Sequence, residues 1–353
     1  MDIRIERTTQ PSTKPEDSIL GFGKYFTDHA FLCNWSEEKG WFDARIAPRA
    51  PVPLDLGACV LHYGQALFEG MKAFHGIDGK DRLLHLPFLA NRMRSGANRL
   101  CLPQPPDEVF MDGVKALLDV EREWIPRTRG CSLYIRPTLI GTESFLGIRP
   151  ASEALFFIIL SPVGSYYAKG LAPVRIWVED QMVRAAPGGL GATKSGANYA
   201  ASMSAGYEAK KKGYDQVLWL DAIEHEWVEE VGTMNVFFQI GDEVVTPALN
   251  GTILGGSTRK AVLEILRHWG VNAVERRISM TEIVKARSEG RLVEAFGTGT
   301  AAVISPIGEL AWKGENLMVG DGETGPLAQR LQAAIQAIQY GESPDELGWS
   351  TLV

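Results

Sequence analysis

The sequence has few cysteines, and their spacing argues against two kinds of stabilised scaffold. Four are present in 353 residues, Cys33, Cys59, Cys101 and Cys131, and no two of them form a C-x-x-C pair. Disulfide frameworks and structural zinc sites depend on closely spaced thiols or on thiols combined with histidines. We therefore predict reduced thiols, a cytoplasmic location and no bound metal ion.

Long apolar runs and blocks of positive charge are also lacking. The longest apolar run, ALFFIIL at 154–160, is far shorter than the roughly 20 residues of a membrane span and is typical of a buried strand. The polar N-terminal stretch indicates neither a signal peptide nor a membrane anchor. With a net charge of −7 and no Lys/Arg block longer than 210–212, the sequence disfavours partners such as nucleic acid.

What the sequence does have is enough apolar residues for two domains. Its 353 residues exceed the roughly 100–200 of a typical domain, and 45% of them are hydrophobic. Gly and Pro interrupt the apolar pattern around 165–173, before a new alternation begins. We predict one domain at 1–168, a linker at 169–180 and a second domain at 181–353.

Hydrophobic periodicity predicts the main elements of the first half. Apolar residues with a helical period cover 86–100 and 107–125, whereas 24–35 and 58–76 are predicted to be rich in strands. The strands come in runs and need not be joined by helices into βαβ units.

Turn and capping residues organise the second half. A hairpin is predicted at 235–248 with its turn at Gly241, and a helix at 257–270 with Ser257 as its cap. The sequence SMTE, which begins at Ser279, fits a capping box. This mixture of hairpins and helices favours an α+β or barrel-like domain over a doubly wound sheet.

A glycine-rich run, GGLGATKSGANY at 188–199, carries a single lysine. It misses the phosphate-loop pattern because Thr193 stands where that pattern has its second glycine, so a nucleotide-binding hydrolase is the less favoured interpretation. An ordinary surface lysine is a second alternative. A partly desolvated Lys194 would instead have a lowered pKa and act as a nucleophile toward an aldehyde cofactor such as pyridoxal phosphate.

Five blocks of the sequence, in order along the chain, carry a specific resemblance. They are LHYGQALFEGMKAF (61–74), SLYIRPTLIGTE (132–143), ATKSGANY (192–199), EEVGTMN (229–235) and FGTGTAA (296–302). Together they resemble the branched-chain amino acid aminotransferases, which are class IV aminotransferases, also called fold type IV pyridoxal phosphate enzymes. The resemblance implies a two-domain α+β or α/β fold, with a smaller mixed sheet-helix N-terminal domain and a larger, barrel-like C-terminal domain that carries the cofactor lysine.

The resemblance also implies a site for pyridoxal 5′-phosphate. In it Lys194 forms the Schiff base, Glu230 faces the pyridine nitrogen and Tyr199 donates a hydrogen bond to the ring oxygen. Glu229 should point to the other side of a strand, because successive side chains alternate. The phosphate would bind at the start of a helix, where free N–H groups favour an anion. The implied phosphate-side residues are Arg92, Ser257, Thr258, Gly299 and Thr300.

Two features of this assignment come from the residues themselves. Without the resemblance, Arg94 and Arg99 are as good candidates as Arg92 for the phosphate-binding arginine. The usual Pro-Gly before the phosphate-binding helix is replaced here by Gly255-Gly256, which makes a more permissive turn.

Substrate selection, by the same resemblance, uses an apolar and aromatic side-chain pocket. Its wall is assigned to Phe22, Tyr63, Phe68, Tyr134 and Tyr166, with Thr233 and Ala301 near the α-carboxylate and Arg136 for the acidic side chain of glutamate.

The predicted reaction is a ping-pong transfer of the amino group of leucine, isoleucine or valine to 2-oxoglutarate, which gives branched-chain 2-oxo acids and glutamate. The resemblance also implies a homodimer. Two alternatives remain open. One is a class IV aminotransferase for methionine or aromatic amino acids, and the other is a nucleotide-binding hydrolase built on the run at 188–195.

Overall fold

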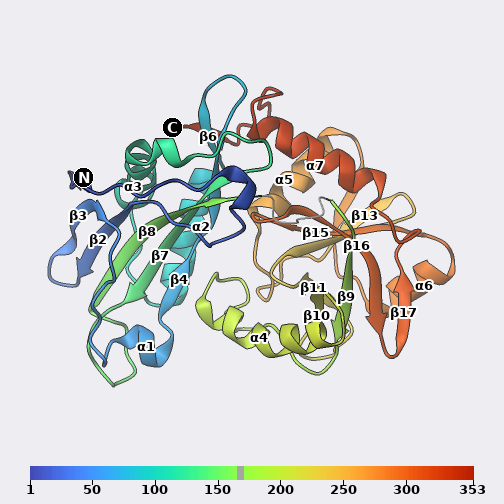
Figure 1. The fold of residues 1–353 in the computed structure, drawn as a ribbon. Helices are drawn as coiled ribbons and strands as arrows, with labels where there is room; N and C mark the ends of the chain where they lie inside the picture. The colour runs from blue at the N-terminus through green and yellow to red at the C-terminus, as the bar shows by residue number, and fades with distance from the viewer. Residues whose placement is uncertain (165–170) are drawn as a thin grey trace. The chain divides into compact units, whose positions relative to one another are not determined.

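The structure is a computed structural model that describes residues 1–164 and 171–353. The chain divides into two compact units, neither of which is continuous in sequence. The first unit contains Met1–Tyr166, Thr193–Gly196 and Ala337–Val353, and the second contains Tyr167–Ala192 and Ala197–Gln336. Each unit is built around its own β-sheet (Figure 1).

The first unit contains a mostly antiparallel sheet of nine strands among the described residues. The strand order is β1-β3-β2-β8-β7-β5-β6-β18, and β4 pairs with β7. The strands are β1 (Arg4–Ile5), β2 (His29–Ser36), β3 (Gly40–Pro48), β4 (Ala66–Phe68), β5 (Met71–His75), β6 (Asp81–Leu84), β7 (Ser132–Gly141), β8 (Glu153–Val163) and β18 (Ser350–Leu352).

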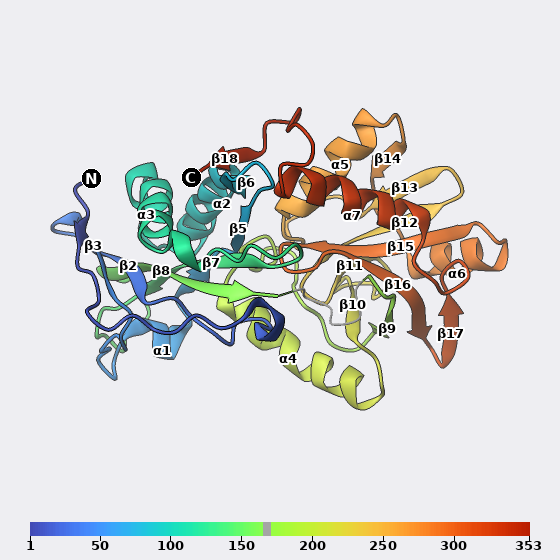
Figure 2. The same ribbon diagram turned by 45° about the horizontal axis from the view of Figure 1, so that its top comes forward.

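Two amphipathic helices, α2 (Leu86–Arg99) and α3 (Asp107–Val120), lie against one face of this sheet (Figures 1 and 2). Their buried apolar residues form one core with residues of β7 such as Leu133 and Ile135. Because side chains alternate along a strand, Tyr134 and Arg136 belong to the opposite face. The helices predicted at 86–100 and 107–125 are thus confirmed, the second one ending earlier in a short 3-10 turn, Arg122–Trp124.

The segment 58–76 was predicted to be rich in strands, and its first part is helical instead. Cys59–Tyr63 form the one-turn helix α1, which ends where Gly64 adopts a left-handed backbone conformation at φ 61°. Glycine reaches this conformation without the steric penalty of a Cβ atom, so the residue both ends the helix and redirects the chain into β4.

The second unit contains a mixed sheet, also with nine strands in the described part of the chain. The order is β11-β10-β9-β16-β15-β12-β13-β14, and β17 pairs with β16. The strands are β9 (Val174–Glu179), β10 (Gln216–Leu220), β11 (Val228–Val231), β12 (Asn235–Ile240), β13 (Glu243–Thr246), β14 (Asn272–Glu275), β15 (Leu292–Gly299), β16 (Val303–Trp312) and β17 (Glu315–Met318).

Four helices accompany these strands in the described residues: α4 (Gly196–Lys211), α5 (Ser257–His268), α6 (Met280–Ser288) and α7 (Pro326–Gln339). Helix α4 connects the parallel strands β9 and β10, and α5 connects the parallel strands β13 and β14, so two crossover units are present among the predicted hairpins. The hairpin β12–β13 turns at Gly241 as predicted, with φ 58°. Strand β9 occupies half of the segment 169–180 that was expected to be a linker.

Helix caps were predicted at two serines, and one of the predictions is wrong. The Oγ of Ser279 accepts a hydrogen bond from the Glu282 N–H at 3.0 Å, which confirms the cap of α6. In α5, however, the cap residue is Gly256 and Ser257 is already the first helical residue. A Cβ at residue 256 would lie 2.1 Å from Oδ1 of Asn235, so the close approach of this side chain requires a glycine there.

No helix in the described residues is long and apolar enough to cross a membrane. Within the same residues, no group of three or more His, Cys, Asp or Glu side chains is arranged to hold a metal ion.

Candidate active site

Lys194 of the glycine-rich run lies against β4 in the first unit. The N–H of Phe68 donates to the carbonyl oxygen of Lys194 at 3.2 Å, and residues 67 and 195 form an isolated β-bridge. The ammonium nitrogen of Lys194 is 5.1 Å from the centre of the Phe68 ring. Burial lowers the pKa of Lys194, and the positive charges of Arg92 and Arg136 lower it further, against the opposing effects of Glu69 and Tyr134.

Arg92 makes a two-point ion pair within the same unit. Its Nε and Nη2 donate to the two carboxylate oxygens of Glu69, each at 2.7 Å, and both side chains are largely buried. Arg94 instead pairs with Asp107 on the surface. Arg92 is thus a buried charge that lowers the pKa of Lys194, whereas Arg94 is bound to a surface carboxylate.

Aromatic rings gather beside Lys194. The guanidinium of Arg136 lies 4.6 Å from the centre of the Phe68 ring, and its Nη2 donates to the hydroxyl of Tyr134 at 2.9 Å. The rings of Phe22 and Tyr134 meet edge to face with centres 5.0 Å apart. A Cβ at residue 70 would lie 2.1 Å from the Tyr134 hydroxyl, so only glycine allows this ring position. The first unit thus combines an amine, apolar rings and a guanidinium.

In the second unit, the consecutive carboxylates Glu229 and Glu230 are both buried on β11, with exposed fractions of 2% and 3%. Oε1 of Glu230 accepts the Leu254 N–H at 2.7 Å and lies 3.3 Å from Nη2 of Arg184. Glu229 accepts from the Thr252 hydroxyl, and burial raises its pKa. The two carboxylates therefore have different partners, as expected for alternating side chains, but Glu229 is not solvated.

The start of α5 presents free backbone donors in the second unit. Ser257 and Thr258 are its first two residues, so their N–H groups have no partner within the helix. The Nδ2 of Asn235 donates to the carbonyl oxygen of Leu254 at 2.8 Å and holds the preceding loop. Such a helix start can bind an anion through its N–H groups and its dipole.

Comparison with known proteins identifies the family. The family model for amino-transferase class IV matches residues 66–310, well over half of the chain. The chain belongs to the class IV aminotransferases. It is 48% identical to branched-chain-amino-acid aminotransferase 2 of Bacillus subtilis over 99% of this chain and 97% of that protein, and 47% identical to transaminase 1 of the same organism over 99% of both.

Solved structures of relatives agree with this membership. The crystal structure of the Escherichia coli branched-chain amino acid aminotransferase superposes with a TM-score of 0.74 and 25% identity, covering 90% of this chain and 98% of the other. The T.th. enzyme of the same name, in complex with N-(5′-phosphopyridoxyl)-L-glutamate, gives a TM-score of 0.73, 25% identity and coverages of 90% and 97%. The predicted fold type IV aminotransferase architecture, enzyme class and pyridoxal 5′-phosphate cofactor are thereby confirmed.

The side chains of this class IV aminotransferase fit that cofactor. An amine with a lowered pKa, a buried carboxylate beside an arginine and a helix start with free N–H groups are the three kinds of group that the aldehyde, the ring nitrogen and the phosphate need. The structure brings Phe22, Phe68, Arg92, Tyr134, Arg136 and Lys194 together in the first unit. The second unit holds Tyr199, Glu230, Thr233, Ser257, Thr258, Gly299, Thr300 and Ala301.

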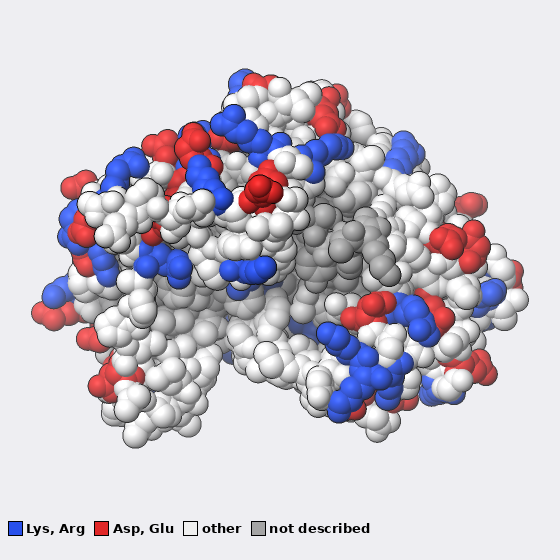
Figure 3. Space-filling model, in the orientation of Figure 1, with Lys and Arg blue, Asp and Glu red and all other residues white. Residues whose placement is uncertain are grey.

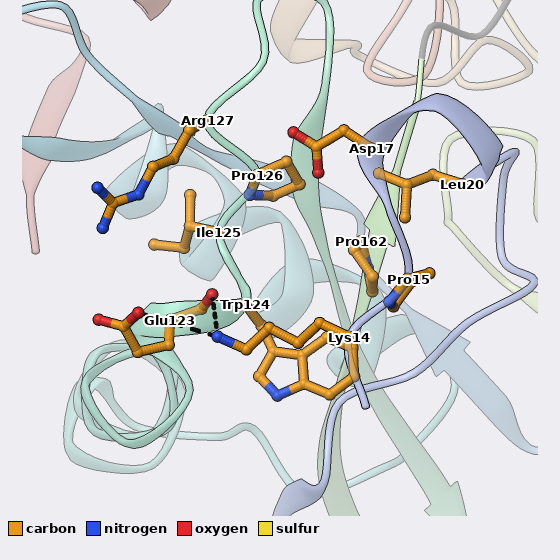
Figure 4. Close-up of a pocket in the computed structure, with 10 residues that line it drawn as sticks. All are labelled: Lys14, Pro15, Asp17, Leu20, Glu123, Trp124, Ile125, Pro126, Arg127 and Pro162. Carbon is orange, nitrogen blue, oxygen red and sulfur yellow. Dashed lines mark hydrogen bonds and ion pairs between the residues drawn. The ribbon is translucent and has the colours of Figure 1, made fainter. Parts of the chain in front are cut away.

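One predicted wall residue, Tyr63, stands apart from the aromatic group. Tyr63 is 40% exposed on α1, and its hydroxyl donates to the carbonyl oxygen of Leu146. Tyr166 lies outside the described residues. A separate pocket of about 350 Å³ lies in the first unit under the N-terminal segment, where Lys14 donates to the carbonyl oxygen of Glu123 (Figure 4). None of the predicted site residues lines that pocket.

Two charged residues of the site were missed by the sequence analysis, Glu69 and Arg184. Glu69 stands inside one of the five matching blocks, so the block itself was a signal. Arg184 and Lys194 are the only charged residues of the stretch 181–207. An isolated charge in a long uncharged stretch is a signal for a buried ion pair, which the structure shows here.

Proposed function

We propose that the protein transfers the amino group of leucine, isoleucine or valine to 2-oxoglutarate and forms branched-chain 2-oxo acids and glutamate in two half-reactions. The observation that carries this proposal is the aromatic group around Lys194, in which apolar rings and the guanidinium of Arg136 lie together. Close relatives named as branched-chain aminotransferases support it, as does the T.th. enzyme solved with 4-methylvaleric acid, a branched apolar acid.

In this proposal Lys194 is the catalytic residue. Pyridoxal phosphate, when bound, supplies an electron-withdrawing ring that makes the substrate Cα–H acidic. The lowered pKa of Lys194 leaves a larger share of its amine unprotonated near neutral pH. The amine is therefore able to accept the proton from the substrate Cα and to return it at C4′ of the cofactor. The ring of Phe68, beside the amine, excludes water from it.

The remaining site residues divide between cofactor and substrate in this proposal. Glu230 supplies the negative charge toward the pyridine nitrogen and Tyr199 a hydrogen bond to the ring oxygen. The phosphate is held by Arg92, Ser257, Thr258, Gly299 and Thr300. Phe22, Tyr63, Phe68, Tyr134 and Tyr166 form the side-chain wall, with Thr233 and Ala301 at the α-carboxylate.

Arg136 gives the proposed pocket its ability to accept two unlike side chains. Its guanidinium rests on the rings of Phe68 and Tyr134, with centres 4.6 and 5.2 Å away. A branched apolar side chain contacts the rings, whereas the distal carboxylate of glutamate pairs with the guanidinium. A preference for methionine or aromatic amino acids is the second candidate, because flat rings also accept those side chains.

An exposed apolar surface supports a homodimer. Helix α1, the turn before it and the loop at 142–150 together expose Leu56, Leu61, Leu146 and Ile148, of which Ile148 is 91% exposed. The two segments are joined by the Cys59 N–H, which donates to the Glu143 carbonyl at 2.9 Å. Few charged side chains lie over α1 (Figure 3). Apolar surfaces of this kind are usually covered by a partner.

The proposal also includes a cytoplasmic location and the two domains 1–168 and 181–353 joined at 169–180. The four cysteines, which the structure leaves as free thiols, and the division into two compact units support these two points.

The test of the proposed function is a set of initial rates with purified protein, pyridoxal phosphate, 2-oxoglutarate and a panel of amino donors. Leucine, isoleucine and valine should exceed methionine and the aromatic amino acids. Lys194→Ala should lose nearly all turnover and the visible absorbance of bound cofactor, because nucleophile and base are one side chain. A preference for aromatic donors would favour the second candidate, and full activity in Lys194→Ala would overturn the proposal.

A further inference from the structure

Arg184 is buried in the second unit, in the segment between β9 and α4, with a side chain 8% exposed. Its Nη2 lies 3.3 Å from Oε1 of Glu230 and also donates to the carbonyl oxygens of Gly191, at 3.2 Å, and Thr252. One nitrogen atom therefore faces a carboxylate and two carbonyl oxygens. Such a convergence of acceptors is stable around a guanidinium, which keeps its charge at all working pH values.

The carboxylate of Glu230 is oriented through one of its oxygens. Both the Leu254 N–H, at 2.7 Å, and Arg184 reach Oε1. Neither of these two groups uses Oε2. Two contacts on one oxygen fix the direction in which the second oxygen of the carboxylate points. A single ion pair with a flexible side chain would not fix that direction.

The neighbouring carboxylate, Glu229, has a different set of partners. It is as buried as Glu230, and burial raises its pKa, while the hydroxyl of Thr252 and the charge of Arg184 act in the opposite direction and Asp221 adds to the rise. Two ionised carboxylates on consecutive residues would repel one another in this buried place. Arg184 pairs directly with only one of them, and that one is Glu230.

The same arginine fixes the glycine-rich run. A Cβ at residue 191 would lie 2.1 Å from the carbonyl oxygen of Thr252, so the backbone at Gly191 and Thr252 can approach this closely only because residue 191 is glycine. Arg184 donates to both carbonyls and neutralises the repulsion of their oxygens. The charge that orients Glu230 therefore also holds the backbone of the glycine-rich run at Gly191.

We propose that Arg184 is a positioning residue that keeps Glu230 ionised and directed toward the pyridine nitrogen of the cofactor. The inference rests on the proposed function, because it gives Glu230 its role there. Arg184 itself touches neither substrate nor the reacting atoms. Its effect is on the ring nitrogen, which must stay protonated if the ring is to accept electrons from the substrate.

The test compares two ligands that differ at the ring nitrogen. Cofactor-free protein is titrated with pyridoxal phosphate and with 1-deazapyridoxal phosphate, in which a C–H group replaces the nitrogen. For Arg184→Met we expect a loss of affinity for pyridoxal phosphate of about tenfold or more, the size of a lost charge-assisted contact, and a much smaller loss for the deaza compound. Arg175→Met, which removes a surface arginine paired with Glu309, is the matched control.

Equal losses for both ligands would overturn the inference, because they would mean that Arg184 only stabilises the local fold. No loss for either ligand would overturn it as well. In a Glu230→Gln background the selective effect of Arg184→Met should disappear, since the carboxylate through which it acts is gone. If Arg184→Met does not fold, Arg184→Gln takes its place with the same criteria, because the amide removes the charge but can still donate hydrogen bonds to the backbone carbonyl oxygens.

The wild-type titration separates this inference from the proposed function. If wild-type protein binds no pyridoxal phosphate, the proposed function fails. If it binds the cofactor and transaminates leucine while the two ligands respond alike to Arg184→Met, only the role of Arg184 is overturned.

Discussion

Arg92 and Glu69 are joined by two parallel hydrogen bonds of 2.7 Å, between a helix and the turn that follows β4. In a largely buried place, such a pair cannot lose one partner without leaving the other charge uncompensated. The pair therefore fixes the position of a guanidinium near Lys194, and it gives Arg92 a structural role beside the one proposed for it in phosphate binding.

This relationship predicts the effect of Arg92→Ala. We expect it to weaken binding of pyridoxal phosphate by about 1.5–3 kcal/mol, the cost of a lost hydrogen bond to a charged group, and to lower the unfolding midpoint of the cofactor-free protein. Arg94→Ala, which breaks only a surface pair with Asp107, is the control and should change little. Equilibrium titration and urea unfolding measure the two effects, and equal cofactor affinity in both variants would show that Arg92 is not a phosphate residue.

The two carboxylates of β11 should respond differently to amide substitution. Glu230→Gln removes the charge assigned to the pyridine nitrogen, so the half-reaction with leucine should slow by roughly 100-fold or more. Glu229→Gln should stay near wild type, because successive side chains of a strand face opposite sides and the amide oxygen can still accept the hydrogen bond from the Thr252 hydroxyl. Single-turnover absorbance with leucine compares the variants. If the half-reaction is slow in Glu229→Gln and normal in Glu230→Gln, then Glu229, and not Glu230, supplies the charge at the pyridine nitrogen.

Arg136→Met should lower activity with glutamate much more than activity with leucine. The variant loses the guanidinium proposed to pair with the distal carboxylate of glutamate, so kcat/KM for glutamate should fall by an amount equivalent to about 1.5–3 kcal/mol. The value for leucine should change much less, since the apolar side chain contacts rings. Arg45→Met, in which a surface pair with Asp43 is lost, is the control. Equal losses for glutamate and leucine would mean that Arg136 supports the pocket without selecting the carboxylate.

Lys72 predicts a pH dependence of stability. It is buried on β5 opposite Tyr134, and burial lowers its pKa from 10.5 to about 8. Between these two values the unfolded chain binds more protons than the folded one, so the contribution of Lys72 to stability rises with pH in that window and is lowest below about pH 8. The full change is on the order of 3 kcal/mol.

Lys72→Met should therefore remove this rise and increase the free energy of unfolding at pH 7 relative to wild type. The measurement is urea unfolding of cofactor-free protein at pH 7 and pH 10. Lys80→Met, at an exposed position after the same strand, is the control and should leave the pH dependence unchanged. A wild-type protein whose stability is the same at both pH values would contradict the prediction.

Elements whose signals are local could be predicted from the amino-acid sequence. The helical period of residues 86–99 and 107–120 and the Ser279 cap depend on neighbours within a few residues, and all three are present in the structure. The five motif blocks likewise determined the family, because each is a short continuous stretch. The cap of α5 was misplaced by one residue because Gly256 is required by Asn235, which lies 21 residues earlier in the chain.

The pairing of charged side chains, by contrast, depends on the tertiary fold. Arg184 and Glu230 are 46 residues apart, and Arg92 and Glu69 are 23 residues apart, so no periodic pattern relates them. Their pairing depends on strand register and on loops that bring backbone carbonyls such as that of Gly191 into the same buried place. Removing a charge from water is costly, and the structure meets that cost by placing each of these carboxylates against a particular guanidinium, which a linear sequence does not specify.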